Sequence, residues 1–290
     1  MLFSGQGIFS RHCWRWFRRG IGERGWDEEV QFHRPWLCRL QADPAEVAEL
    51  VELLHAGSWR SCNVNDCLAE CVAVGCSCSR SINPTARDSF LRMAADHIRK
   101  SCVGVEEVSY ASLGSGLLRF DFCLLELLLA DGVPISAVHL VDSQYEPDAK
   151  GYLRHRVALA QFASWFAGRG VDVYAHHALE RYAFEARRAA ALPIAVVQVD
   201  CTELTAVFEK EVKPMLEEVL QYGGLYCTLT SREGASGAGS LGSTNAWAEF
   251  WRLHPDTGRM KLESLTCFRP GDQSGTPVDV NEPLPRAVDH

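Results

Sequence analysis

A glycine turn between two apolar segments is the part of the sequence that points most directly to chemistry. Residues 108–113, VSYASL, are followed by Gly114, Ser115 and Gly116 and then by the helical pattern of residues 117–129. A strand, a glycine turn and a helix in this order present backbone N–H groups to a nucleotide-like ligand. The stretch therefore predicts a cofactor site and leaves the substrate open.

Two acidic residues stand where predicted strands end. Residues 135–141 form a nearly continuous apolar run, as expected of a strand buried on both faces, and Asp142 follows them. Residues 194–199 form another apolar run, which is followed by Asp200. Ligands of open α/β sheets bind at the carboxyl ends of the strands, so both carboxylates are candidates for ligand contacts. The alternative for each is an ordinary helix cap.

The elements that must position these residues alternate between strand and helix, which is typical of a doubly wound, mostly parallel α/β sheet. Apolar runs predict strands at 108–113, 135–141, 171–175, 194–199 and 225–230, and a terminal antiparallel hairpin at 247–253 and 260–268. Helical periodicity predicts helices at 43–57, 83–98, 117–129, 153–166, 180–191 and 204–220. We therefore expect a seven-stranded sheet that is preceded by a mainly helical N-terminal region.

The composition divides the chain into three parts. Residues 1–104 hold an Arg-rich leader and a helical, Cys-rich region, and residues 105–268 hold the predicted sheet. Residues 269–290 are rich in Pro, Asp and Gly and are expected to form a disordered tail. The residues singled out above all lie in the middle part.

The overall composition excludes several classes of protein. Of the 290 residues, 47% are hydrophobic and 23% are charged, close to the average of soluble globular proteins. The net charge of −8 makes nucleic acid a less favoured partner. No segment approaches the roughly 20 apolar residues of a membrane-spanning helix. The 12 cysteines are expected to be reduced thiols of a cytoplasmic protein, and the Arg-rich start leaves organelle targeting as the alternative.

The order of elements from residue 108 to residue 268 resembles that of the class I S-adenosylmethionine-dependent methyltransferases, a Rossmann-like superfamily. In that family a glycine loop follows the first strand, an acidic residue ends the second, and an antiparallel hairpin joins the sixth and seventh. The resemblance covers about 160 of the 290 residues and leaves the N-terminal third outside it. It implies S-adenosylmethionine as the cofactor and a small molecule or a protein as the methyl acceptor.

The resemblance also assigns roles to residues at the strand ends. Gly114 and Gly116 match the glycine loop, where the backbone passes close to the methionine part of the cofactor. Asp142 matches the acid that binds the ribose hydroxyls, and His177 stands where the family often has Asp beside the adenine. Asp200 stands where residues face cofactor and substrate, and it is the candidate catalytic base. The expected cofactor-binding residues are Ser112, Gly114, Ser115, Gly116, Asp142, Ser143 and His177.

Two departures from the family pattern keep a second interpretation open. Ser112 stands where the family commonly has Asp or Glu, and Leu118 replaces the usual third glycine. Both changes also occur in copies without cofactor binding, so the alternative is a catalytically inactive, methyltransferase-like module that binds other proteins. A nicotinamide-dependent oxidoreductase is the third hypothesis, against which the missing glycine and the terminal hairpin argue. The methyl acceptor and the oligomeric state are not determined by the sequence.

Two further motifs carry weaker signals. Residues 237–242, GAGSLG, match G-x-G-x-x-G, but they neither follow a strand tightly nor open a helix, so we expect a flexible linker there. A group of cysteines only approximates the spacing of a structural zinc site, and we expect buried thiols and no metal. These cysteines are Cys62, Cys67, Cys71, Cys76 and Cys78.

Overall fold

The computed structural model describes residues 68–70, 77–80, 82–146, 148–149, 152–187, 193–200, 208–230, 245–272 and 275–278. Several predictions fall outside the described residues, namely the Arg-rich leader, the helix at 43–57 and the glycine-rich segment 237–242. The same holds for the clustered cysteines apart from Cys78, which is buried.

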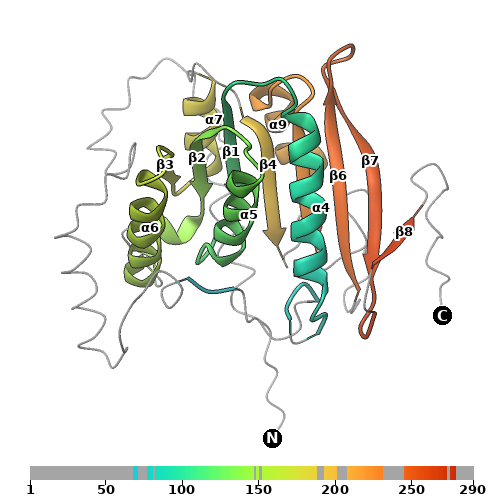
Figure 1. Ribbon diagram of the computed structural model, residues 1–290, viewed down its shortest axis with the longest axis horizontal. Coiled ribbons are helices and arrows are strands. Elements are labelled where there is room, and N and C mark those ends of the chain that lie inside the picture. The colour runs from blue at the N-terminus through green and yellow to red at the C-terminus, as the bar shows by residue number, and fades with distance from the viewer. Residues whose placement is uncertain are drawn as a thin grey trace, which may run out of the picture.

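A single eight-stranded sheet runs through the molecule in the order β3-β2-β1-β4-β5-β6-β7-β8 (Figure 1). The parallel strands are β1 (Val108–Leu113), β2 (Ile135–Val141), β3 (Asp172–His176), β4 (Pro193–Asp200) and β5 (Leu225–Thr230). The antiparallel strands are β6 (Ala246–His254), β7 (Arg259–Phe268) and β8 (Thr276–Val278). The first five strands follow the order of a Rossmann-type sheet. The predicted α/β class with its terminal hairpin is therefore confirmed.

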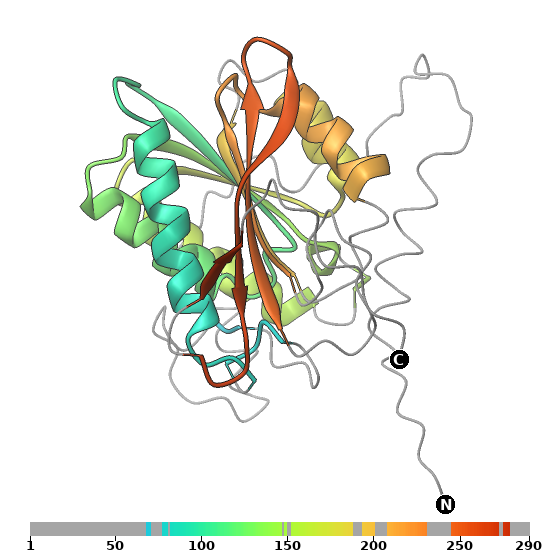
Figure 2. The same cartoon turned by 90° about the vertical axis from the view of Figure 1, so that its right-hand side faces the viewer.

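Helices cover both faces of this sheet. One face packs against α4 (Ala86–Ser101), α5 (Arg119–Ala130) and α6 (Tyr152–Ala167), and the other against α7 (Leu179–Ala186) and α9 (Lys213–Val219), which follows a π-helical turn at Phe208–Val212. Figure 2 shows α4 and α9 on opposite sides of the sheet. Successive strand residues point to opposite faces, so Tyr110 joins the first core and Ala111 the second.

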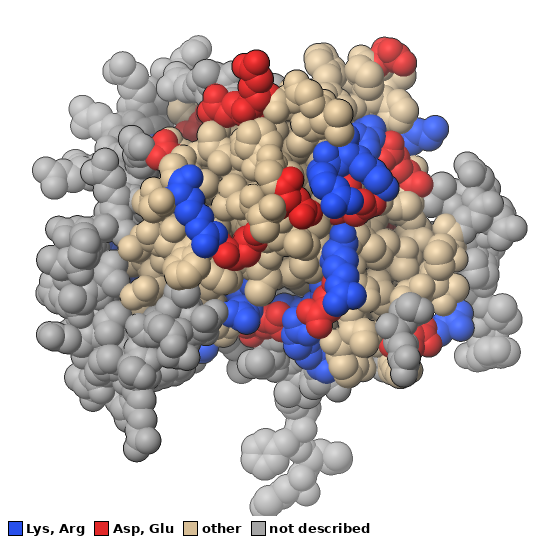
Figure 3. Space-filling view, viewed as in Figure 1, with Lys and Arg blue, Asp and Glu red and all other residues tan. Residues whose placement is uncertain are grey.

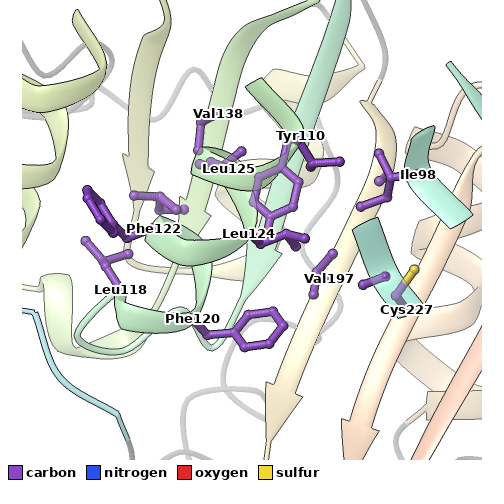
Figure 4. Packing of buried hydrophobic residues seen from close by; sticks show 14 of the residues in the cluster. Ile98, Tyr110, Leu118, Phe120, Phe122, Leu124, Leu125, Val138, Val197 and Cys227 are labelled. Atoms are coloured by element: carbon purple, nitrogen blue, oxygen red, sulfur yellow. The ribbon is translucent and has the colours of Figure 1, made fainter. Parts of the chain in front are cut away.

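Helix α5 carries the side chains that hold the glycine turn against the sheet. Leu124, Leu125 and Leu128 recur at helical spacing and are fully buried. Leu124 lies beside Tyr110 of β1 in the close view of this core (Figure 4). The start of α5 is thereby fixed relative to the carboxyl end of β1.

The sheet has one strand more than the seven that the sequence predicts. Strand β8 lies in the segment 269–290, for which disorder is expected, and it pairs with the edge of β7. Three residues that include Pro277 show no alternating pattern, and proline is tolerated in a strand only at an edge such as this one. Helix α7 ends at Ala186 in the described residues, whereas the sequence predicts a helix to residue 191. The domain boundaries remain predictions.

Helix α4, which precedes the sheet in sequence, packs directly on it. Its predicted core residues Phe90, Ala94 and Ile98 are buried. The ring of Phe90 stacks on Phe120 of α5 with centroids 5.5 Å apart, and it lies 5.7 Å from the ring of Phe250 in β6. Part of the N-terminal region therefore belongs to the same hydrophobic core as the sheet.

Acidic and basic side chains are interspersed on the face that α4 covers (Figure 3). Arg99 and Lys100 both pair with Asp96, each at 2.6 Å. Arg80 binds Asp88 and Glu70 at 2.7 Å each, which joins the described residues 68–70 and 77–80 to the start of α4. Exposed pairs such as those on α4 contribute roughly 0–1 kcal/mol each, so apolar packing holds α4 in place.

Replacing Phe90 with Ala tests whether α4 is an integral part of the core. We expect the free energy of unfolding to fall by about 3–5 kcal/mol, because a fully buried ring that joins three elements is lost. Val103→Ala, at a side chain that is 82% exposed, is the control and should change stability by less than about 0.5 kcal/mol. Urea denaturation measures both, and equal midpoints would contradict the assignment.

Candidate functional site

The glycine turn after β1 is tied to the end of β2. Gly114 and Gly116 have φ angles of 66° and 54°, in the left-handed region that glycine adopts without strain. The N–H groups of Gly114 and Ser115 both donate to the carbonyl of Val141, at 2.8 and 3.2 Å. The turn is therefore held beside the carboxyl end of the neighbouring strand, where ligands of such sheets bind.

Asp142 closes this arrangement with both oxygens of its carboxylate. Oδ2 accepts a hydrogen bond from Gly116 N at 2.7 Å, and Oδ1 accepts one from Gln144 N at 2.8 Å. The second contact caps the 3-10 turn Ser143–Tyr145, so the cap that the sequence leaves open as an alternative is present. Each carboxylate oxygen has two lone pairs, so both keep the capacity to bind a ligand hydroxyl.

Tyr145 adds a second link between the same two segments, and sequence reasoning missed it. Its hydroxyl lies 2.6 Å from Ser115 Oγ and donates to the carbonyl of Gly116 at 3.3 Å. Burial is the main cause that raises the pKa of Tyr145 well above its usual value, and the nearby charge of Asp142 adds to it. The tyrosine therefore remains a neutral donor. Its position three residues after Asp142 was the available signal.

The remaining predicted residues lie at the same edge of the sheet. The carbonyl of His176 accepts from Asp142 N at 3.0 Å, which places the exposed His177 directly beyond that contact. Asp200 ends β4 and pairs with Thr230 of β5, and its side chain lies outside the described residues. The structure thus brings the turn and Asp142 together, with His177 beside them and Asp200 two strands away across β1.

Ser112 takes part in a buried polar cluster beneath the turn. Tyr110 donates to Asp121 Oδ1 at 2.6 Å, and the side chain of Ser112 also hydrogen-bonds to Asp121. Burial raises the pKa of Asp121 to about 6, although both hydrogen bonds act to lower it. Sequence reasoning missed Asp121, for which the signal was an acid in the first turn of a largely apolar helix.

Leu118 occupies a backbone position that favours glycine. Its φ angle of 66° makes it the one described residue other than glycine with a positive φ, immediately before α5. Such a conformation costs roughly 1–2 kcal/mol, and burial of a leucine side chain contributes about 1.5–3 kcal/mol in the opposite direction. Ala69 N donates to the carbonyl of Leu117 at 3.1 Å and supports this turn. The backbone therefore takes a glycine-type bend with a leucine at this position.

A buried histidine pair lies on the other face of the sheet. His139 Nδ1 lies 3.2 Å from His176 Nε2, and His176 Nδ1 lies 3.9 Å from Glu185 Oε2. Arg181 Nε binds the same glutamate at 2.6 Å. Burial lowers the pKa of His139 to about 4 and is the main cause that lowers the pKa of His176 to about 3. Both rings are therefore neutral at neutral pH.

Polar side chains also cross the sheet near the carboxyl ends of β4 and β5. Gln198, Thr228 and Glu249 stand opposite one another on neighbouring strands and are buried. Tyr226 donates to Gln198 Oε1 at 2.6 Å, and Trp251 Nε1 donates to Glu249 Oε2 at 2.9 Å. Sequence reasoning passed over these residues because they stand within otherwise apolar strands, where Glu249 was the clearest signal.

The described residues show neither a candidate metal site nor a candidate membrane span. They contain no group of three or more His, Cys, Asp or Glu residues that could hold a metal ion. They also contain no helix with the length and apolar character needed to cross a membrane.

No protein-family model and no curated protein matches the sequence. One similar structure is a putative protein-L-isoaspartate O-methyltransferase from Plasmodium falciparum in complex with S-adenosyl-L-homocysteine, with 10% identity, a TM-score of 0.39, and coverage of 79% of this chain and 98% of that one. Another is a SAM-dependent methyltransferase from Agrobacterium tumefaciens, with 11% identity, a TM-score of 0.34, and coverage of 63% and 62%.

A third similar structure is 1,6-didemethyltoxoflavin-N1-methyltransferase from Burkholderia thailandensis with bound S-adenosylhomocysteine. The sequence identity is 11% and the TM-score is 0.31. The matched region covers 78% of this chain and 77% of the other chain. The strand order and the two helical layers of the chain itself define it as a Rossmann-like α/β protein.

Removing the carboxylate of Asp142 tests the hydrogen bonds that hold the turn. We expect Asp142→Ala to lower the free energy of unfolding by about 0.5–2 kcal/mol, the usual effect of losing such a cap. The amide hydrogens of Gly116 and Gln144 should exchange faster with solvent, as measured by NMR, while those of β5 should not. Asp148→Ala, at an exposed acid nearby in sequence, is the control. Unchanged exchange at Gly116 would contradict the contact.

The histidine pair predicts a pH dependence of stability. The folded-state pKa values of His139 and His176 lie below the usual value of 6.5, so the unfolded chain binds more protons as the pH falls through 6.5. Stability that is present above this pH should be lost toward pH 4, by up to about 1.4 kcal/mol per pH unit for each histidine.

The variant His139→Gln isolates this effect from the other titrating groups. Between about pH 7 and pH 5 it should lose less stability in urea denaturation than the wild type, since one buried imidazole no longer differs between the folded and unfolded states. His177→Gln, at an exposed ring, should keep the wild-type slope. Equal slopes in all three proteins would disprove the burial of a neutral pair.

Proposed function

We propose that the chain is an S-adenosylmethionine-dependent methyltransferase. The observation that carries this proposal is the contact between Gly116 N and Asp142 Oδ2, which joins a glycine turn after β1 to an acid after β2. This pair lies at the carboxyl ends of the parallel strands β1 and β2. It is next to the point where the strand order reverses, between β1 and β4. Open α/β sheets bind their ligands there, and nucleotide ligands in particular use the first turn.

The residues present fit this cofactor. A Cβ atom added at Gly116 would meet the carbonyl oxygen of Gly114 at 3.9 Å, an ordinary van der Waals contact, but the φ angle of 54° favours glycine there. Asp142 has one backbone hydrogen bond on each oxygen and can accept ribose hydroxyls with its remaining lone pairs. Gly114 and Ser115 would lie along the methionine part, and Ser143 and His177 would lie beside the adenine.

The bound cofactor supplies an electrophilic methyl group on a positively charged sulfur. The chain has to hold a nucleophile of the acceptor in line with that methyl group and close to it, since positioning accounts for much of such a rate enhancement. Asp200, at the end of β4, is the residue that we propose to take a proton from the acceptor. For the acceptor we propose a small molecule or a protein, and for the compartment the cytoplasm.

Ligand-induced stabilisation tests the proposal. S-adenosylmethionine at 100 times its dissociation constant should add about 2.7 kcal/mol to the free energy of unfolding, and the melting temperature should rise with ligand concentration. NAD at the same concentration should cause no shift. Asp142→Ala should lose the response, whereas Asp148→Ala should keep it. With S-adenosylmethionine that is labelled in its methyl group, the label should pass to a component of a cell extract only in the presence of those variants that bind the cofactor.

The two alternative functions give different results in the same experiment. A methyltransferase-like module without activity would show no shift with S-adenosylmethionine or S-adenosylhomocysteine, and Asp142→Ala would leave that response unchanged. An oxidoreductase would respond to NAD instead. Either result would overturn the proposal.

A further inference from the structure

Asp121 is a buried carboxylate next to the proposed cofactor site, and no cation is among its hydrogen-bond partners in the part of the chain that the structure describes. It lies in the first turn of α5 and is only 2% exposed. Tyr110 Oη donates to its Oδ1 at 2.6 Å, and Ser112 supplies a second hydrogen bond. Buried charges in proteins are normally paired with an opposite charge because desolvation is costly. The hydrogen bonds here come from neutral groups.

The charged group that acts on Asp121 is another carboxylate. Asp142, which binds Gly116 N at 2.7 Å, lies close enough to raise the pKa of Asp121 further, after the larger effect of burial. Asp142 therefore contacts the glycine turn directly, and Asp121, in the first turn of α5, adds a second carboxylate close enough to interact with it electrostatically. The N-terminus of α5 offsets this negative charge only in part, since a helix end carries about half a positive charge.

The electrostatic balance of the turn would be completed by a positive charge on the ligand. S-adenosylmethionine carries a sulfonium cation, whereas S-adenosylhomocysteine, the product of methyl transfer, has a neutral sulfur in the same place. The two molecules share their adenosine, amino and carboxylate groups. A negative field at the turn therefore distinguishes them by the charge on sulfur alone.

We propose that Asp121 is the specificity-determining residue that makes this site bind the cationic cofactor more tightly than its neutral product, an inference that rests on the proposed function. Asp121 acts through its field and needs no contact with the ligand, because charges interact over many ångströms in a low-dielectric interior. Preference for the cationic form would favour exchange of the product for fresh cofactor after each turnover. We expect Asp121 to change the ratio of the two dissociation constants roughly tenfold, which corresponds to about 1.4 kcal/mol.

The proposal predicts how this preference depends on pH. Burial raises the pKa of Asp121 to about 6, so its charge, and with it the preference, should be lost as the pH falls through that value. The groups that face Asp121 are Tyr110 and Ser112 on β1, Asp142 after β2 and Tyr145 on the following turn. Burial keeps both tyrosines neutral throughout this range. The thiol of Cys227, which acts on Tyr110 from β5, is also held neutral by burial.

The test is a comparison of dissociation constants for S-adenosylmethionine and S-adenosylhomocysteine by isothermal titration calorimetry at about pH 5.5 and pH 7.5. In the wild type, the ratio in favour of S-adenosylmethionine should be several-fold greater at the higher pH. Asp121→Asn should show the low ratio at both pH values, while its affinity for S-adenosylhomocysteine stays within about twofold of the wild type. Asp148→Asn removes an exposed negative charge and should keep the wild-type ratios.

Tyr110→Phe gives a second test that keeps the carboxylate in place. The hydrogen bond from Tyr110 lowers the pKa of Asp121, so its removal should shift the loss of preference to higher pH. This variant decides the matter if Asp121→Asn does not fold. A wild-type ratio that is independent of pH and unchanged by both substitutions would overturn the role of Asp121 and leave the proposed function standing. Failure of the wild type to bind either molecule would overturn the proposed function, and this inference with it.

Discussion

The hydrogen bond from the Gly116 amide to the carboxylate of Asp142 is the interaction on which the candidate site depends. The two residues follow different strands, Gly116 after β1 and Asp142 after β2, and the bond joins the two loops at the edge of the sheet. Gly114 and Gly116 both take positive φ angles, and in the turn that they form the N–H of Gly116 faces the end of β2. Charge-assisted hydrogen bonds are stronger than neutral ones, so this contact strengthens the link that Tyr145 also makes between the two loops.

A second layer of polar groups supports this contact from below and beside it. Tyr145 reaches across to Ser115 and the carbonyl of Gly116, while Tyr110 and Asp121 join β1 to the start of α5. Each of these side chains is buried and hydrogen-bonded, as polar groups in protein interiors generally are. The turn is therefore held from three directions, and a ligand would meet donors that are already oriented.

Leu118 shows how the chain keeps this geometry without one of the expected glycines. Its backbone adopts the left-handed bend, and its side chain is buried in the same core as Phe120 and Leu124. Burial of the leucine offsets the conformational strain, so the bend forms with a leucine in place of a glycine. Leu118, which kept the interpretation as an inactive module open, is therefore compatible with an intact turn.

Much of the fold could be predicted from the sequence, because its signals are local. Strand and helix periodicity, the glycines of the turn and the position of Asp142 after a buried run are all properties of short segments. The pairing of Asp121 with Tyr110, of His139 with His176 and of β8 with β7 joins residues on different elements. Such contacts depend on how helices and strands pack against one another. Periodicity in the sequence shows which face of an element is buried, but not which element it packs against. The sequence by itself therefore determined the α/β class and predicted the edge of the sheet at which the candidate site residues lie. Only the tertiary structure decided which polar groups converge there, because burial and hydrogen bonding between distant segments set their positions and charges.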